Sequence, residues 1–405
     1  MKDSSVEAKI EFIVQLGKAL HTYGASSMRL EQALGRVSDA LGLQGQFFSM
    51  PTALFSAFRI DPTNEITRMV RVQPGGVNLE KLALIDELGD QVIAGLTSVQ
   101  LGLTSLNEIL NAPPRYSALT TIAAFAITGG CLTVFLGASI YDFIVSLLLG
   151  GFIGYLFLKV VQHQKLARVY EAIVAISASI IAHGLQHWFP QISPGVVILS
   201  SLIVLVPGLA ITIGMAELAT QNLIAGSARL MEAFTILLKM VFGVLIGTKL
   251  MLSIFPNDVT VQTSAIPAWS LWPALFTVAF AFTILFEVHP RDRKWVMASA
   301  ITGFLTTKYG GDFLGPEVGV FLGGMVVGAG SNLFARFINR PASITLLPGI
   351  ILMVPGSVGF KGFTYLINKD TILGLDTAFS VFFISMGLVA GLLFGNILVT
   401  PRKSL

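Results

Sequence analysis

Apolar and polar positions divide the chain into a mixed N-terminal part and a strongly apolar remainder. Apolar residues recur with helical spacing over residues 5–22, 26–42, 78–96 and 103–111. Residues 66–72 alternate as a strand does, after a turn at residues 61–64. The pattern therefore predicts an α+β head over residues 1–115, which ends at Pro113-Pro114-Arg115.

Beyond the head, apolar runs reach the length that crosses a bilayer, about 20 residues in a helix. The ten expected spans cover residues 117–137, 140–160, 171–188, 195–215, 230–252, 270–288, 294–309, 316–335, 343–359 and 377–399. The seventh and ninth are short or interrupted. The predicted fold class is a polytopic α-helical membrane protein with about ten transmembrane helices and a cytoplasmic α+β domain.

A helix-breaking triplet is repeated in this apolar part. Val206-Pro207-Gly208 recurs 148 residues later as Val354-Pro355-Gly356. In the same register, the glycines at positions 208, 214, 226, 243 and 247 recur at 356, 362, 374, 391 and 395. Such self-similarity indicates an internal duplication. Because each half has five spans, an odd number, we expect a 5+5 inverted repeat with modules at residues 116–253 and 254–405.

Composition agrees with a membrane protein and excludes other classes. The chain is 54% hydrophobic and 12% charged, with a mean hydropathy of +0.76. Its net charge of +3 comes without a basic patch interleaved with aromatic residues, so no nucleic-acid partner is expected. Cys131 is the single cysteine, and His183 and His187 have no carboxylate or thiol beside them. We therefore expect no metal and no cofactor.

The basic residues predict the orientation. A cytoplasmic head places eleven basic residues in inner loops or the tail: Lys159, Lys165, Arg168, Arg229, Arg291, Arg293, Lys294, Arg336, Arg340, Arg402 and Lys403. Three, Lys308, Lys361 and Lys369, would lie outside. This obeys the positive-inside rule, so we expect a multi-pass protein of a bacterial cytoplasmic (inner) membrane with both termini in the cytoplasm.

The repeated triplets are the main candidates for a substrate site. Proline removes a backbone donor and glycine frees the dihedral angles, so a broken span exposes N–H and C=O groups that bind a carboxylate or a cation. Pro207-Gly208 and Pro355-Gly356 supply such breaks, and Pro348-Gly349 adds a second one to the ninth span. The alternative is that these prolines only kink helices for packing.

Charged candidates follow the break in the first half only. Glu217, Arg229, Glu232 and Lys239 correspond to Tyr365, Thr377, Ser380 and Gly387 in the second half. The Arg229 fork suits a carboxylate, and Glu232, one turn on, would pair with it or carry a proton. An ordinary ion pair at the membrane edge is the alternative. Lys239 lies near the middle of the fifth span, where a charge is functional unless the side chain snorkels to the interface.

Hydroxyl groups complete the candidates. Ser200 and Ser201 lie two turns before Pro207, where they would contact a polar substrate or bond back to a carbonyl one turn earlier. In the head, His21, Ser26, Ser27 and Asp39 supply the residue types of a hydrolase. Their spacing shows no strand-turn-helix elbow, and serines after Gly24 are typical of a helix start, so we expect no enzyme.

Several motifs resemble those of the threonine/serine exporter family. They are His21-Thr22-Tyr23-Gly24-Ala25-Ser26-Ser27-Met28-Arg29-Leu30-Glu31 through Leu41-Gly42-Leu43, Val206-Pro207-Gly208-Leu209-Ala210, Glu217, Gly226-Ser227-Ala228-Arg229-Leu230-Met231-Glu232-Ala233, and Leu347-Pro348-Gly349 with Val354-Pro355-Gly356. Their order is similar to that of the fused form, in which a head plus five spans joins a second five-span module. The family's acidic position is usually aspartate, so Glu217 is a small departure.

The resemblance implies secondary-active export of threonine and serine by alternating access, driven by the proton or charge gradient. Split members of the family imply an alternative, export of a small dicarboxylate such as succinate. A channel and a head with hydrolase activity are the rivals from other classes. The expected partners are a small-molecule substrate and the lipid bilayer, and homo-oligomerisation stays open.

Overall fold

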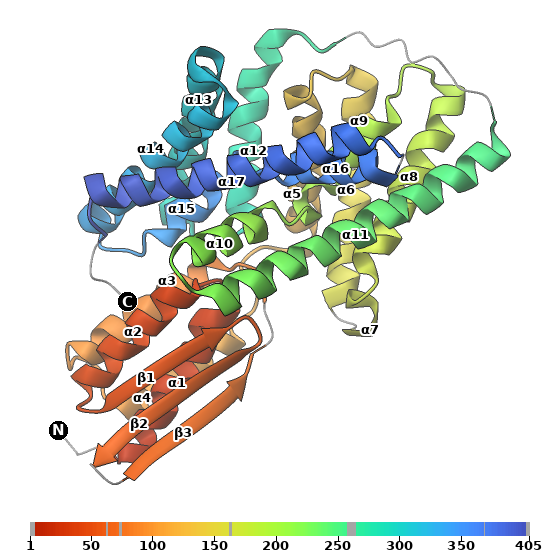
Figure 1. Cartoon of the computed structure of the whole chain (residues 1–405). Helices are drawn as coiled ribbons and strands as arrows, with labels where there is room; N and C mark the ends of the chain where they lie inside the picture. The colour runs from red at the N-terminus through yellow and green to blue at the C-terminus, as the bar shows by residue number, and fades with distance from the viewer. Residues whose placement is uncertain are drawn as a thin grey trace.

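The computed structural model describes residues 5–61, 64–72, 75–161, 164–256, 265–367 and 369–401. A small α+β head lies at one end, and a larger helical body lies beyond it (Figure 1). The long helices α11 (Leu223–Ile254) and α17 (Thr371–Leu398) run across the body (Figure 1). The chain is therefore a head docked on a helical body, as the apolar pattern predicts.

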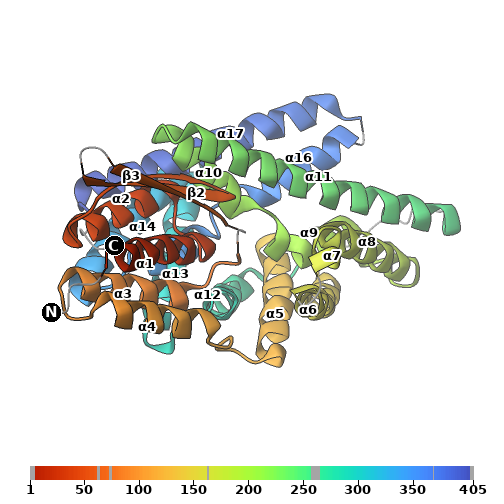
Figure 2. The ribbon, with the colours of Figure 1, turned by 90° about the horizontal axis from the view of Figure 1, so that it is seen from below.

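The head contains four helices and one sheet. Its elements are α1 (Val6–Thr22), α2 (Ser27–Ala40), β1 (Gln44–Met50), β2 (Ala53–Asp61), β3 (Asn64–Arg71), α3 (Leu79–Ile93) and α4 (Val99–Asn111). The strands pair antiparallel in the order β1-β2-β3. Seen from below, α1 lies between the sheet and the pair α3 and α4 (Figure 2). The Phe-rich segment that the pattern left unassigned forms β1 and most of β2.

The body helices fall where the apolar runs predict them. They are α5 (Ala118–Phe135), α6 (Ile140–Val161), α7 (Gln164–Ala167), α8 (Tyr170–Trp188), α9 (Pro194–Leu202), α10 (Gly208–Ala219), α11, α12 (Leu271–Leu285), α13 (Arg293–Leu314), α14 (Pro316–Ile338), α15 (Ser343–Ile350), α16 (Gly356–Ile367) and α17. Within the described segments, six helices are long and apolar enough to cross a membrane, or seven if a bent pair is one span. Ten spans therefore remain a prediction.

Helix boundaries repeat along the body with the offset read from the glycines. The α9 and α15 helices end at Leu202 and Ile350, α10 and α16 begin at Gly208 and Gly356 and end at Ala219 and Ile367, and α11 and α17 begin at Leu223 and Thr371. Each of these pairs is 148 residues apart. Gln221 and Lys369, again 148 apart, both have positive φ, at 65° and 64°. The helix breaks and turns of the two halves thus occur in the same order and at the same spacing.

Packing repeats as well. In the first half Gly243 of α11 contacts the carbonyl of Ala172 on α8, and in the second half Gly391 of α17 contacts the carbonyl of Phe321 on α14. A Cβ at either glycine would lie within 2.7 Å of that oxygen, so these helices approach as closely as only glycine allows. An equivalent glycine contact therefore packs α11 against α8 and α17 against α14.

The two proline-glycine breaks touch each other. Pro194–Leu205 and Gly208–Ala219 are bent by 55° at the first break. A Cβ on Gly208 would lie 3.1 Å from the backbone nitrogen of Gly356, and one on Gly356 would lie 3.1 Å from the Cα of Gly208. Both glycines and both preceding prolines are buried. The broken helices of the two halves therefore cross backbone to backbone.

The head shares its core with the body. The cluster that contains Phe12 and Leu34 of the head continues through Val296, Phe334 and Leu347 of the body. The first backbone N–H groups of α3, at Leu79 and Glu80, donate to the carbonyls of Phe286 and Glu287 after α12, at 3.0 and 3.1 Å. These groups have no partner inside α3, so the body completes the helix start.

We predict that Gly208→Ala destabilises the protein. The added methyl group would lie 2.6 Å from the Cγ2 of Val354, so the two breaks must separate. Overpacking of this kind costs about 1–3 kcal/mol. Thermal unfolding in detergent measures it, with Gly195→Ala as the control, because Gly195 of α9 is exposed and nothing lies within 4 Å of its Cβ position. Equal unfolding temperatures for the two variants would contradict the contact.

Candidate transport site

A buried ion pair joins the end of α10 to the first turns of α11. The guanidinium of Arg229 donates from Nε to Oε2 of Glu217 at 3.0 Å and from a terminal nitrogen to Oε1 at 3.2 Å. The short turn at Gln221, which has a left-handed backbone, folds α10 back on α11 and makes this contact possible. The Glu217 side chain is 2% exposed and that of Arg229 is 20% exposed. The pair is thus a bidentate, largely desolvated contact.

The head supplies two further donors to the same carboxylate. Ser27 donates to Oε1 of Glu217 from its backbone nitrogen at 3.2 Å and from its hydroxyl at 3.1 Å. Ser27 is the first residue of α2, where the helix dipole favours a negative charge. Ser26, the residue before it, makes no side-chain cap. Glu217 of the body therefore takes the place of a capping side chain and ties the head to α10.

His21 of the head lies within electrostatic reach of this cluster. Its ring is buried and its Nε2 donates to the carbonyl of Met50 at 2.8 Å, so in the neutral ring Nδ1 is an acceptor. Within the described segments Nδ1 has no hydrogen-bond partner. Burial lowers the pKa of His21, the Met50 hydrogen bond raises it, the charge of Arg229 lowers it and that of Glu217 raises it. The ring therefore lies within electrostatic reach of both members of the ion pair.

The charged candidates have partners that the sequence did not identify. Arg229 pairs with Glu217 and not with Glu232, which is exposed one turn further along α11. Lys239 lies near the middle of α11, as the sequence predicts, and its Nζ lies 3.4 Å from Oε2 of Glu171 in the first turn of α8. The structure thus brings together Glu217 and Arg229, and no ion pair of Glu232 is found among the described residues.

The two serine candidates differ in their hydrogen bonds, and one of the proline candidates does not break its helix. Ser201 bonds back to the carbonyl of Ile198 at 3.1 Å, whereas the Ser200 hydroxyl, also fully buried, has no partner among the described residues. The second break expected at Pro348-Gly349 is absent from α15, because that helix continues through Pro348 to Ile350. Neighbouring groups in a helical body compensate for the lost backbone hydrogen bond of such a proline.

The hydrolase constellation is not assembled. His21 and Ser27 both lie near Glu217, but Asp39 is exposed in the last turn of α2. Twelve residues of helix separate Asp39 from Ser27, a distance of about 18 Å. Nor do the described residues contain a group of three histidine, cysteine or acidic side chains that could hold a metal. His187 instead stacks on Phe255, with ring centroids 4.2 Å apart.

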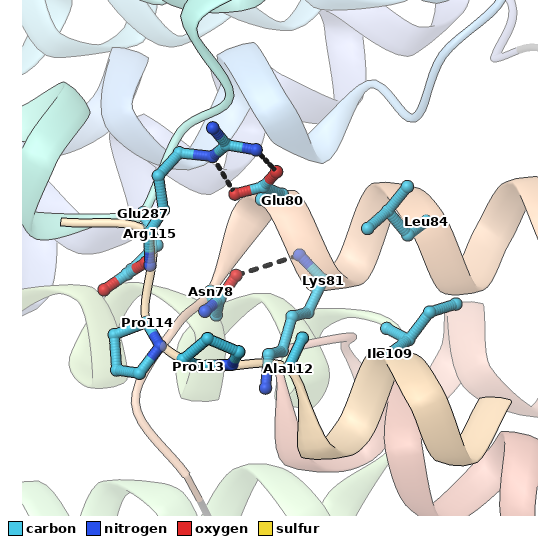
Figure 3. A pocket seen from close by; sticks show the side chains of 10 residues that line it. All are labelled: Asn78, Glu80, Lys81, Leu84, Ile109, Ala112, Pro113, Pro114, Arg115 and Glu287. Carbon is cyan, nitrogen blue, oxygen red and sulfur yellow. Dashed lines mark hydrogen bonds and ion pairs between the residues drawn. The ribbon is translucent and has the colours of Figure 1, made fainter. Parts of the chain in front are cut away.

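A cavity of about 280 Å³ lies at another point of the head–body junction (Figure 3). Figure 3 shows that the Arg115 guanidinium meets the Glu80 carboxylate as a fork. Arg115 also donates from its backbone nitrogen to Glu287 at 3.1 Å, and the Lys81 ammonium donates to the Leu110 carbonyl at 2.9 Å. The charged side chains that line this cavity thus all bond to groups of the protein, and the contact between Arg115 and Glu287 joins the head to the body.

Sequence reasoning missed the contribution of the head. The sequence places Ser27 at a helix start, among the hydrolase residue types and in a family motif, but it does not link Ser27 to Glu217, which lies 190 residues away. The available signal was that Ser27, Glu217 and Arg229 all belong to motifs of one family. Spacing alone offers no such link.

Comparison with known proteins shows similarity over nearly the whole chain. A family model described as "Putative threonine/serine exporter" matches residues 11–251, and one described as "Threonine/Serine exporter, ThrE" matches residues 272–398. Their limits fall on either side of the junction predicted between the two modules. No solved structure matches.

Relatives with similar sequences are fungal membrane proteins. "Pheromone-regulated membrane protein 10" of Eremothecium gossypii is 28% identical over 86% of this chain and 48% of its own length. The protein of the same name from Zygosaccharomyces rouxii is 25% identical over 96% of this chain and 43% of its own length. "Uncharacterized protein C7D4.12c" of Schizosaccharomyces pombe is 24% identical over 87% and 48%. The chain thus spans less than half the length of these relatives.

We predict that the ion pair is strongly coupled. Removing one partner of a buried pair leaves the other charge unpaired and costs about 3–5 kcal/mol. Glu217→Ala should therefore destabilise the protein more than Glu217→Ala combined with Arg229→Ala. Thermal unfolding of the single and double variants measures the coupling, and Glu232→Ala is the control because Glu232 is exposed on the same helix. Additive effects of the two substitutions would contradict a direct pair.

We also predict that His21 makes the stability of the protein depend on pH. Because burial lowers the pKa of His21, the unfolded state binds more protons than the folded state as pH falls below about 6.5, the ordinary value. The contribution of His21 to stability should therefore fall between pH 7.5 and 5.5, and His21→Gln should remove this part of the pH dependence. Unfolding temperatures across that range test it, with His187→Gln as the control. A wild-type slope retained in His21→Gln would contradict the assignment.

Proposed function

The chain belongs to the threonine/serine exporter family, and we propose that it exports threonine and serine across the cytoplasmic membrane by alternating access. The family and the apolar helices make it a membrane protein of an exporter family. The substrate, the driving force and the mechanism are the proposal. The driving force we propose is the proton-motive force.

The contact between the two breaks carries this proposal. Broken helices of matching halves that meet inside a membrane protein are typical of secondary transporters, whose substrate sites lie where the repeats meet. Here Gly208 and Gly356 meet backbone to backbone, each at the start of a broken helix. In the proposed inverted arrangement of ten spans, movement of one module against the other opens this crossing to each side in turn.

The first module supplies the chemistry in this proposal. Glu217 and Arg229 lie on the same broken hairpin as the first break, and the corresponding residues of the second module, Tyr365 and Thr377, are uncharged at neutral pH. Threonine and serine carry a carboxylate, for which the Arg229 fork is suited. The second module then serves as the matching scaffold.

Orientation follows the basic residues. With the head in the cytoplasm, Arg168, Arg291 and Arg293 lie on the inner side, as the positive-inside rule favours. Arg402 and Lys403 lie outside the described residues. The head, which shares its core with the body and holds Glu217, then covers the inner end of the path. We propose that it gates access from the cytoplasm.

We predict that the purified chain in liposomes accumulates labelled threonine by counterflow. A carrier exchanges labelled for unlabelled substrate against a gradient, whereas a channel does not. Pro207→Ala, Arg229→Ala and Lys239→Ala should each slow the exchange, with Arg168→Ala as an exposed basic control.

A panel of threonine, serine and succinate as trapped solutes identifies the substrate. Exchange of succinate alone would replace the amino-acid assignment with a dicarboxylate exporter. Wild-type rates in all three variants would contradict the placement of the site. Flux without counterflow would indicate a channel.

A further inference from the structure

The second half of the chain shows what the hairpin needs in order to fold. There α16 and α17 form the same turn as α10 and α11, with a left-handed residue at the equivalent position. Yet Tyr365 and Thr377 stand where Glu217 and Arg229 stand in the first half. The hairpin therefore folds without a charge pair. Because a buried ion pair is weak evidence for stability, the pair in the first half calls for another role.

The Glu217 carboxylate occupies a complete anion site. Arg229 binds both of its oxygens, and Ser27 gives Oε1 two more hydrogen bonds. The same donors would bind the carboxylate of a small solute. Conversely, Glu217 would bind an ammonium group. Arg229 thus suits the carboxylate of an α-amino acid, and Glu217 suits its ammonium group.

We propose that Glu217, Arg229 and Ser27 form the cytoplasmic recognition site for a zwitterionic amino acid. The solute carboxylate binds Arg229, its ammonium group binds Glu217, and Ser27 of the head keeps Glu217 in place. This rests on the proposed function and deepens it, because it names the charge state of the substrate and gives the head a part in the site.

Charge balance makes the site selective. Opening the pair would leave two buried charges without partners, which is costly. A zwitterion supplies an opposite charge to each of them. A dicarboxylate satisfies Arg229 but sets a second negative charge against Glu217. The pair therefore favours amino acids over succinate.

The position of the site agrees with an entrance. Glu217 lies nine residues after Gly208 on α10, so about 14 Å of helix separate it from the break. It faces the head, on the side from which a solute for export arrives in the proposed orientation. The His21 ring, nine-tenths buried, lies within electrostatic reach of both charges.

The experiment measures binding to the purified full chain with three probes. They are threonine, 2,3-dihydroxybutyrate and threonine amide. In 2,3-dihydroxybutyrate a hydroxyl replaces the ammonium group of threonine, and in threonine amide a neutral amide replaces the carboxylate. Hydrogen bonds to charged groups set the scale, so each lost contact should weaken binding about tenfold or more. Wild-type protein should therefore prefer threonine to both analogues by about this factor.

The variants separate the two ends of the solute. Glu217→Gln should weaken threonine binding by the same factor but should not weaken dihydroxybutyrate binding. Arg229→Gln should weaken the binding of threonine and of dihydroxybutyrate but leave the binding of threonine amide unchanged. Ser27→Ala should reduce threonine binding severalfold, and Glu232→Gln, the matched exposed carboxylate on α11, should change nothing. Thermal unfolding confirms that each variant is folded.

Three outcomes would overturn the proposal. One is that Glu217→Gln weakens threonine binding and dihydroxybutyrate binding equally. Another is that Glu232→Gln weakens threonine binding as much as Glu217→Gln does. If Glu217→Gln fails to fold, equal affinity of the wild type for threonine and dihydroxybutyrate is decisive. In each case threonine counterflow by the wild type leaves the exporter function standing. A wild type that neither binds nor exchanges any amino acid rejects both.

Discussion

The backbone contact between the two proline-glycine breaks is the constraint on which the arrangement of the body depends. Gly208 and Gly356 approach so closely that a side chain on either would meet the other. A proline precedes each glycine, and α10 and α16 begin at the glycines, so both helices start from this contact. From there each helix folds back, at Gln221 and Lys369, onto the long helix of its own half.

Symmetry in the scaffold and asymmetry in the chemistry follow from this arrangement. Both halves repeat the break, the turn and the glycine contacts of the long helix. Among the described residues, the α10–α11 hairpin has the Glu217–Arg229 pair and the bond from Ser27 of the head, whereas the α16–α17 hairpin has Tyr365 and Thr377 at the corresponding positions. Because Glu217 completes the start of α2, any movement of α10 disturbs the seat of the head. The head and the first module are thus coupled by one carboxylate.

The sequence predicts the regular part of the fold well, because glycine and proline mark breaks whatever surrounds them. The offset of 148 residues and the ten apolar runs both correspond to helices and breaks in the structure. Pro348 is the exception, because it lies inside α15, two residues before that helix ends. The partners of the charges could not be predicted. Glu232 is nearer to Arg229 in sequence than Glu217 is, but only the fold of the hairpin decides which carboxylate faces the guanidinium.

The most direct test of the account is a reversible cross-link between the two breaks. In a Cys131→Ser background, Val206→Cys and Val354→Cys place thiols on either side of the contact. A disulfide or a short bifunctional reagent should then stop threonine exchange in liposomes, and reduction should restore it after a disulfide. Threonine should also slow the cross-linking, because a bound solute separates the breaks. Full exchange by the cross-linked protein would show that the path does not pass between them.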